Sequence, residues 1–310
     1  MMTRSATEPG TDRDVLPVPT KGPPWHGYVS ADFFLSGLSA GMFMLAGFGY
    51  LIGPGIYGGA SRIGYLAAFP LILVDLACLV ADLGDPTRFH HMLRVFKLRS
   101  PMSTGTWALS VYALVGFVAF ILALLGFSIL TEWRAIIGAI GILPAVYVTA
   151  YKGVMLSNTA QPGWKDARWL GGEFALSSGA MGAAGLLLIS LALTDPNATA
   201  GYRLALIMFL ATGLFFKLLL ASHFFGRVEL RHYVPAVTYA FILAIGTLAP
   251  LARSLATSSE PALLAAAILT VTGELGFRHY IIELPRQLGD RSEPHSHAIS
   301  SSEKLYRPSL

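Results

Sequence analysis

The sequence predicts an all-α integral membrane protein, with eight transmembrane helices packed in a compact bundle. Of the 310 residues, 54% are hydrophobic and only 13% are charged, and the mean hydropathy is +0.59. Apolar stretches of about 18 residues or more recur along the chain, which is the length that crosses a hydrocarbon core of ~30 Å. Only helices and closed barrels satisfy the backbone in lipid, and these stretches are too long for barrel strands.

Eight apolar segments lie between Pro, Gly and charged residues. We predict them near residues 28–53, 63–82, 104–126, 134–157, 170–193, 202–224, 233–254 and 261–280. Together they form a membrane domain over residues 25–283. We expect a disordered cytoplasmic tail at 1–24, without a secretory signal peptide, and a polar cytoplasmic tail at 284–310. No repeat at a fixed period is evident, and a division into two four-helix bundles stays open.

Helix-breaking residues and caps set the predicted boundaries around the second and third segments. The second segment ends at Asp82, before Gly84 as a C-cap residue and Pro86, which cannot continue the helix. The third segment opens with Ser103 or Thr104 as its predicted N-cap. Inside the spans, small-residue pairs at 37 and 41, and at 179 and 182, would let helices approach closely.

Basic residues are distributed unevenly between the two faces of the predicted bundle. With eight spans, both termini share one face with the loops that follow the second, fourth and sixth spans. That face carries sixteen of the 22 Lys and Arg residues, with Arg278 counted among them, and the opposite face carries four. By the positive-inside rule the rich face is cytoplasmic, which predicts that both termini lie inside. The net charge of +4 therefore reports topology, not nucleic-acid binding.

The cysteine and histidine content limits the cofactors of this chain. The single cysteine, Cys78, cannot alone hold an iron–sulfur cluster or a disulfide. All eight histidines lie at span ends, in loops or in tails, whereas haem b needs facing histidines well inside the bilayer. We therefore expect no haem, no iron–sulfur cluster and no other metal in this chain. We expect the protein in the inner or plasma membrane of the cell.

Ionisable residues inside spans are costly and usually mark a functional path. The predicted spans contain several of them, including Asp32, Asp75, Asp82, Lys152, Glu173, Lys217 and Glu274. Asp75 and Asp82 are two turns apart on one helix, about 10.5 Å along its axis. Simpler interpretations stay open. Lys152 can snorkel to the surface, and Lys217 can snorkel or pair with Glu173 or Glu274.

Four motifs together resemble the NrfD family, the membrane subunits of polysulfide-reductase-like enzymes. They are FLSGLSAG at residues 34–41, DLG-x-P-x-R at 82–88, SPMS-x-G-x-W at 100–107 and YKGVMLS at 151–157. The resemblance implies a quinone site, for menaquinone or ubiquinone, within the bundle. It also implies a ferredoxin-like iron–sulfur partner subunit, connected in turn to a molybdopterin-type catalytic subunit. The chain would then be the quinone-reactive subunit of an oxidoreductase complex.

A quinone needs hydrogen-bond donors for its two carbonyl oxygens and a route for protons. The predicted quinone-binding residues are Tyr28, Asp32 and Tyr151. The predicted proton-transfer residues are Asp75, Asp82 and Lys152. The predicted partner-docking residues, all in the loop after the second span, are Arg88, Arg94, Lys97 and Arg99. Arg88 is expected to keep Asp82 ionised, so that Asp82 and Tyr151 flank one quinol as proton acceptor and hydroxyl donor.

Two other classes of function are weighed against the quinone subunit. A multi-pass transporter or an ion or proton channel would explain the buried charges, but it predicts inverted repeats or paired broken helices, and no convincing pair is visible. A purely structural anchor for a soluble enzyme would not need Asp75 or Lys152. The quinone subunit accounts for both the buried charges and the basic loop.

Overall fold

The computed structural model describes residues 27–82, 91, 93–94, 96–226 and 233–289. Eight stretches of these residues are helical, long enough and apolar enough to cross a membrane, which confirms the predicted fold class. The helices are α1 (Gly27–Ile52), α2 (Pro54–Ala81), α3 (Pro101–Leu125), α4 (Thr131–Ser157), α5 (Leu170–Ala192), α6 (Pro196–Phe225), α7 (Tyr233–Leu243), α8 (Ala249–Ala256) and α9 (Glu260–Gly289). A π-helical turn, Ala244–Leu248, joins α7 to α8 within the seventh span. The predicted tail at 1–24 lies outside the described residues, as do residues 290–310 of the predicted tail at 284–310. Residues 284–289 of that predicted tail belong to α9.

Several helices are longer than the sequence predicts. Helix α2 begins at Pro54, directly after Gly53, although the predicted span begins at 63. Asp195 caps α6 through the backbone N–H groups of Asn197 and Ala198, so this helix starts before the predicted 202. Helix α9 runs to Gly289 instead of ending at 280. The additional turns are more polar than the spans, and the hydropathy pattern therefore does not include them.

The predicted N-cap of α3 was wrong by one turn. Ser100 is the N-cap, and its side chain accepts a hydrogen bond from the Ser103 backbone N–H at 3.4 Å. Pro101 occupies the first helical position, where its fixed φ suits a helix and its missing N–H costs nothing. Ser103 and Thr104 therefore lie inside the first turn, and Thr104 is free to turn its hydroxyl toward α4. The predicted C-cap, Gly84, lies outside the described residues.

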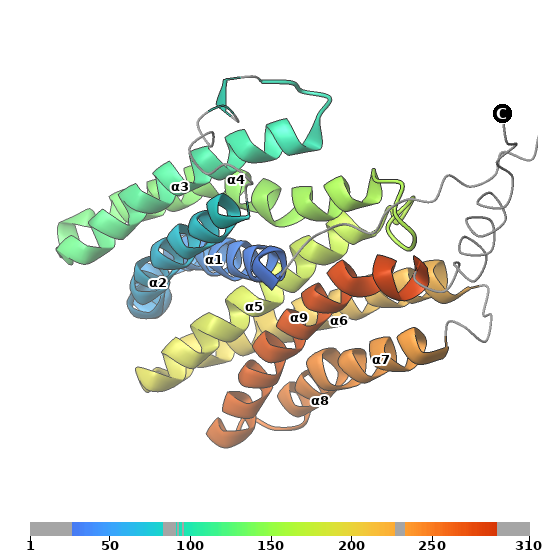
Figure 1. Cartoon of the computed structure of the whole chain (residues 1–310). Coiled ribbons are helices and arrows are strands. Elements are labelled where there is room, and N and C mark those ends of the chain that lie inside the picture. Colours follow the sequence, from blue (N-terminus) through green and yellow to red (C-terminus); the bar gives the residue numbers. More distant parts are fainter. Residues whose placement is uncertain (1–26, 83–90, 92, 95, 227–232, 290–310) are drawn as a thin grey trace, which may run out of the picture.

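The helices form two groups that meet at α1 and α5. Figure 1 shows α1 to α4 on one side of the molecule, and α6 to α9 on the other. Contacts between the groups involve α1 with α5, α4 with α5 and α1 with α9. At the crossing of α1 and α5, a Cβ atom on Gly41 would collide with the backbone of Ser178, and one on Gly182 with the backbone of Gly41. The predicted close approach at these small residues is confirmed. Because glycine has no side chain, the backbones of α1 and α5 contact each other directly where the two groups of helices meet.

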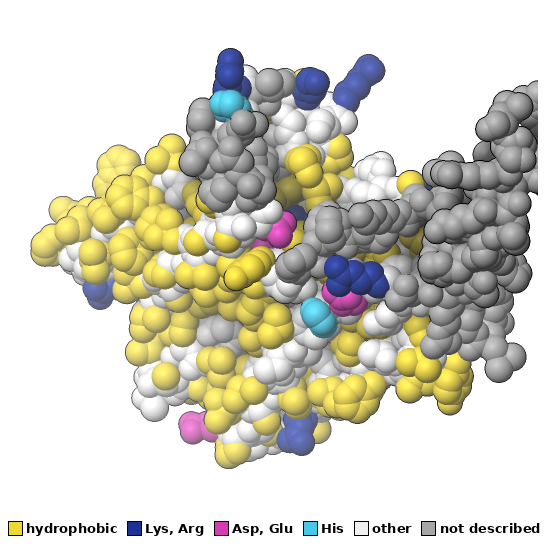
Figure 2. All heavy atoms as spheres, in the orientation of Figure 1, with side chains coloured by type: hydrophobic (Ala, Val, Ile, Leu, Met, Phe, Trp, Pro, Cys, Tyr) yellow, Lys and Arg dark blue, Asp and Glu magenta, His cyan; other side chains and the backbone are white. Residues whose placement is uncertain are grey.

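The surface has a broad apolar flank and a basic edge. Figure 2 shows hydrophobic side chains over most of the visible face, with Lys and Arg side chains along its upper edge. Exposed apolar residues of the described helices include Leu114 and Leu143, which are 65% and 77% exposed. Such exposure is what a bilayer accommodates, because lipid tails replace water around these side chains.

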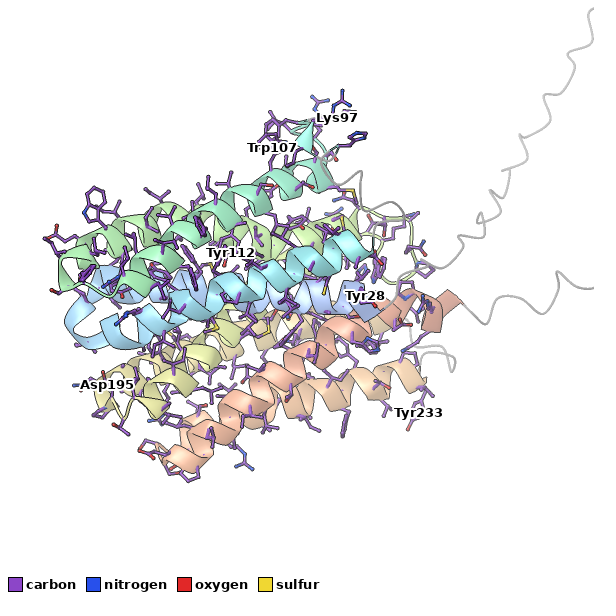
Figure 3. The ribbon with its side chains drawn as sticks, turned by 60° about the vertical axis from the view of Figure 1, so that its left-hand side comes forward. Tyr28, Lys97, Trp107, Tyr112, Asp195 and Tyr233 are labelled. Carbon is purple, nitrogen blue, oxygen red and sulfur yellow. The ribbon has the colours of Figure 1, made fainter. Side chains whose placement is uncertain are left out.

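The ends of the helices fix the level of each residue in the bundle. Helices α1, α3, α5 and α7 begin at the end of the bundle that carries the basic loop, and α2, α4, α6 and α9 end there. Figure 3 accordingly shows Tyr28 and Tyr233 near one end, Asp195 at the opposite end, and Tyr112 between them. Asp32 lies near the start of α1 and Lys152 near the end of α4, so both are close to the basic end.

Candidate functional site

A buried ionic cluster joins α1, α2 and α4 near the basic end. The Lys152 ammonium lies 2.9 Å from Oδ2 of Asp32 and 3.5 Å from Oδ1 of Asp75. It also donates hydrogen bonds to Oγ of Ser36 at 2.6 Å and to the backbone carbonyl of Asp32 at 3.0 Å. All four side chains are buried. The interpretation of Lys152 as a snorkelling residue was wrong, because its two acidic partners hold it in the interior.

The aromatic ring of Phe33 closes one side of this cluster. The Lys152 ammonium lies 5.1 Å from the centroid of that ring, within the range of a cation–π interaction. A hydroxyl pair continues from the cluster helices toward the middle of the bundle, where Ser39 Oγ and the Tyr112 hydroxyl are 2.7 Å apart. The cluster therefore lies between the basic end and a polar pair at mid-depth.

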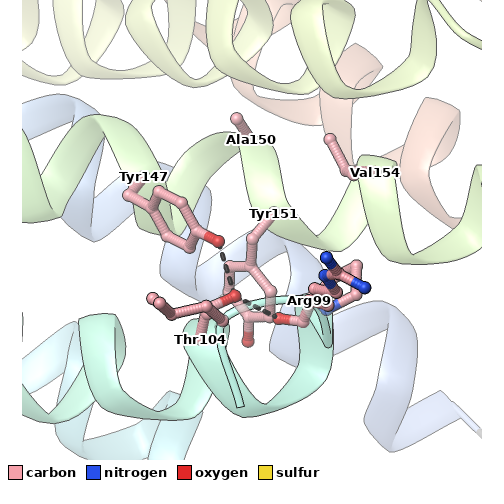
Figure 4. A pocket seen from close by; sticks show the side chains of 8 residues that line it. Arg99, Thr104, Tyr147, Ala150, Tyr151 and Val154 are labelled. Carbon is pink, nitrogen blue, oxygen red and sulfur yellow. Dashed lines mark hydrogen bonds between the residues drawn. The ribbon is translucent and has the colours of Figure 1, made fainter. Parts of the chain in front are cut away.

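A small cavity opens beside the cluster, between α3 and α4. Its volume is about 210 Å³, and its walls include Leu98, Ala150 and Val154 together with polar groups of Arg99, Thr104, Tyr147 and Tyr151. Figure 4 shows Tyr147 and Tyr151 reaching from α4 toward Thr104 on α3. The Thr104 and Tyr147 hydroxyls are 2.6 Å apart, and the two tyrosine rings are stacked with centroids 6.4 Å apart.

Tyr151 is the side chain that links the cavity to the protein interior. Its ring packs against Gly105, where a Cβ atom would collide with it, and only 9% of the residue is exposed. Within the described residues its hydroxyl has no hydrogen-bond partner, although it lines the cavity. A hydroxyl that faces a cavity and can both donate and accept a hydrogen bond is suited to a ligand there. The next residue, Lys152, points to the ionic cluster.

The predicted quinone-binding residues are not brought together in one place. Tyr28 is 56% exposed at the start of α1, and it is not among the residues that line the cavity. Asp32 belongs to the ionic cluster. Tyr151 alone of the three lines the cavity. Sequence reasoning missed Thr104 and Tyr147. Tyr147 precedes Tyr151 by one helical turn, and this spacing places both on one face.

The structure places the remaining predicted residues in two regions. Asp75 and Lys152 meet in the cluster, whereas Asp82 is exposed at the C-cap of α2. Arg94, Lys97 and Arg99 are exposed in the segment before α3, and Arg99 also lines the cavity. Arg88 lies outside the described residues. Among those residues, no group of three or more His, Cys, Asp or Glu side chains is arranged to hold a metal ion.

A second buried ionic cluster joins α5, α6 and α9. The Lys217 ammonium lies 2.6 Å from Oε1 of Glu274 and 3.0 Å from Oε1 of Glu173. Of the two alternatives left open for Lys217, snorkelling or pairing with Glu173 or Glu274, the structure shows pairing, and with both acids. Arg278 Nη1 lies 3.6 Å from Oε2 of Glu274. The assignment of Arg278 to the basic loop face was wrong. Because α9 continues to Gly289, Arg278 is inside the span and only 1% exposed.

Arg278 also ties the second cluster to α1. Its Nε donates a hydrogen bond to the backbone carbonyl of Phe33 at 2.9 Å, and its Nη2 donates one to Oγ of Ser178 at 3.0 Å. The rings of Phe33 and Phe174 meet edge to face, with centroids 5.9 Å apart. The two clusters are therefore separated by a pair of aromatic rings, which each contact a cation of one cluster.

Comparison with known proteins assigns the family. No curated protein matches the chain in sequence. The family described as "Polysulphide reductase, NrfD" matches residues 17–286, and this range includes every described helix except the last residues of α9. The match confirms the resemblance carried by the motifs in the first, second, third and fourth spans. With a match over most of its length and eight apolar helices, this chain belongs to the NrfD family of polysulphide reductase membrane subunits.

Proposed function

We propose that this chain is the quinone-reactive membrane subunit of a multi-subunit oxidoreductase. It exchanges electrons between the quinone pool and a ferredoxin-like iron–sulfur subunit, which is connected to a molybdopterin-type catalytic subunit. The observation that carries the proposal is the adjacent pair Tyr151 and Lys152. Tyr151 presents to a cavity a hydroxyl that has no hydrogen-bond partner among the described residues, and Lys152 joins two buried carboxylates. Family membership supports a membrane redox subunit.

The cavity fits the headgroup of a quinone. Its volume of about 210 Å³ is below the ~300–1,000 Å³ of pockets that enclose whole drug-sized ligands, so it suits a ring with its tail left in lipid. Leu98, Ala150 and Val154 offer apolar walls, and the hydroxyl of Tyr151 offers a donor for a carbonyl oxygen. Arg99 supplies a positive charge at the rim. A bound quinone accepts two electrons and two protons on reduction.

The chain's own residues then hold and move protons. Tyr151 orients the ring through its hydroxyl, and its neighbour Lys152 keeps the Asp32 and Asp75 carboxylates close to the cavity. Asp75 lies on the same helix as Asp82, which is exposed at the basic end. We assign Asp75 and Lys152 to proton transfer inside the bundle, and Asp82 to proton exchange with water. A positioned acid or base typically contributes ~10²–10⁴ in rate.

Tyr151→Phe tests the cavity. The substitution keeps the ring that packs on Gly105 and removes only the hydroxyl, so the complex should assemble normally. We expect quinone-dependent turnover of the whole complex to fall by ~10² or more. Tyr280→Phe is the matched control, because Tyr280 is also buried but donates its hydroxyl to the Pro235 carbonyl in the other half of the molecule. Equal turnover in both variants would show that the Tyr151 hydroxyl does not take part in the quinone site.

The segment before α3 is assigned to partner docking. Arg94, Lys97 and Arg99 are exposed there, and they alternate with Phe96 and Leu98, which are 58% and 79% exposed. A partner surface with carboxylates around an apolar centre would complement this pattern, since charges at an interface rim mainly steer association and set specificity.

Charge reversal tests this docking surface. Arg94→Glu, Lys97→Glu and Arg99→Glu together should weaken co-purification of the soluble subunits by about tenfold or more, because each exposed ion pair contributes ~0.2–1 kcal/mol and reversal adds repulsion. The loss should be greatest at low ionic strength. Arg253→Glu, an exposed change at the opposite end, should leave co-purification unchanged. Full recovery of the soluble subunits with the triple variant would contradict the assignment.

A further inference from the structure

The first halves of α1 and α5 have related sequences. Residues 32–41 read DFFLSGLSAG, and residues 173–182 read EFALSSGAMG. At a constant interval along the chain they pair Asp32 with Glu173, Phe33 with Phe174, Leu35 with Leu176, Ser36 with Ser177 and Gly41 with Gly182. The pattern is too short and too common in composition to be evident by inspection of the sequence alone. Its meaning comes from where these residues lie.

Equivalent residues of the two segments contact each other in space. Gly41 and Gly182 meet where α1 crosses α5, and the rings of Phe33 and Phe174 meet edge to face. The contact of α4 with α5 has a counterpart in that of α9 with α1. When equivalent residues of two copies contact each other, the two copies are related by a two-fold axis. Each half has four spans, so both begin at the same end of the bundle, and the axis runs along the membrane normal.

The two ionic clusters occupy equivalent places in the two halves. In each half, the first span contributes an acid, Asp32 or Glu173, and the second contributes Asp75 or Lys217. The fourth span of each half contributes an aromatic residue followed by a cation: Tyr151–Lys152 on α4 and Phe277–Arg278 on α9. Helix α9 also contributes Glu274 to the second cluster.

The clusters differ in their charge balance. The first has two carboxylates and one ammonium, so one negative charge is uncompensated if all three groups are ionised. Oδ1 of Asp32 and Oδ2 of Asp75 are buried there without a partner. The second cluster has two carboxylates and two cations and is neutral. Within the described residues, Glu173 Oε1 and Oε2, Glu274 Oε2 and Arg278 Nη1 are also buried there without a hydrogen bond. Both carboxylates, however, lie within 3.0 Å of the Lys217 ammonium, and Arg278 adds a second cation 3.6 Å from Glu274.

We propose that the first ionic cluster binds one exchangeable proton between Asp32 and Asp75, whereas the second cluster, at the equivalent place in the other half, is a proton-free clamp between the halves. Burying an unpaired carboxylate costs several kcal/mol, and two carboxylates that share one site take up a proton to avoid it. In the second cluster the Arg278 guanidinium balances the second carboxylate. In the first cluster a bound proton has that role. The inference rests on the charges and contacts alone, not on the assignment of quinone.

Infrared spectroscopy of the purified chain tests this proposal. A protonated carboxyl group has a carbonyl stretch that is separate from the amide bands and shifts in D₂O. In a detergent without ester groups, at neutral pH, the wild-type protein should show one such group. Among the described residues, the buried acids are Asp32, Asp75, Glu173 and Glu274. Asp75→Asn and Asp32→Asn should each abolish the band, because either leaves one carboxylate opposite one ammonium.

Variants of the second cluster provide the controls. Glu274→Gln should leave the band unchanged, because the carboxylate that it removes carries no proton. Lys217→Met should double the band area, because it leaves the second cluster with two carboxylates and only Arg278. No band in the wild type, or a band that persists in both aspartate variants, would overturn the proposal. A band lost in Glu274→Gln would place the proton in the wrong half. Quinone-dependent turnover is not part of this readout, so the proposed function can fail independently.

Discussion

Lys152→Met is expected to lower the free energy of unfolding by ~3–5 kcal/mol, the largest effect on stability that we predict. Removing one partner of a buried ion pair leaves the other without compensation. Here two carboxylates, Asp32 and Asp75, lose their shared ammonium, and Ser36 loses the donor at 2.6 Å. Thermal or denaturant unfolding of the purified protein in detergent would measure the change.

Two further variants make this test specific. Lys165→Met removes an exposed lysine from the loop between α4 and α5, and it should change the stability by less than ~1 kcal/mol. Adding Asp32→Asn to Lys152→Met should restore part of the loss, because only one ionisable group, Asp75, is then buried without the ammonium. A Lys152→Met protein as stable as the Lys165→Met protein would show that the cluster contributes nothing to the fold.

Asp75→Asn is expected to reduce quinone-dependent turnover of the complex by ~10²–10⁴, the largest effect on activity that we predict. Asparagine has almost the same shape, and one carboxylate remains opposite Lys152, so assembly should be preserved. The substitution removes a group that can accept and release a proton beside the cavity. Turnover of the intact complex with a soluble quinone, together with co-purification of its soluble subunits, would measure both properties.

Asp82→Asn and Glu132→Gln complete this experiment. Asp82 is exposed at the end of α2, and we expect its loss to reduce turnover less, because water can exchange protons with other groups at the surface. Glu132 is exposed in the first turn of α4 at the opposite end, and its loss should have no effect. Full turnover with Asp75→Asn would exclude the buried carboxylate from proton transfer. An Asp82 variant more impaired than the Asp75 variant would move the proton acceptor to the surface.

The sequence by itself determined the class of fold, the number of spans and the family. Hydropathy is a sum over about 20 neighbouring residues, so it is fixed locally and requires no knowledge of packing. The same is true of motifs such as YKGVMLS, in which Tyr151 and Lys152 are neighbours in the chain. Lys217 shows how far this local information reaches. The sequence left open whether it snorkels or pairs with Glu173 or Glu274, and only the structure shows that it contacts both acids.

Only the tertiary structure decided which charges face each other. Lys152 could equally have snorkelled to the surface, and Arg278 was counted with the basic face, because a sequence records the depth of a residue but not the direction of its side chain. The rotation of each helix about its axis is set by packing, here by the crossing of Gly41 and Gly182, which turns Asp32 toward α4 and leaves Phe33 against Phe174. The cavity beside Tyr151 has the same origin, since Gly105 and Thr104 reach it from another helix. Contacts between distant segments therefore determine the site, and no local pattern specifies them.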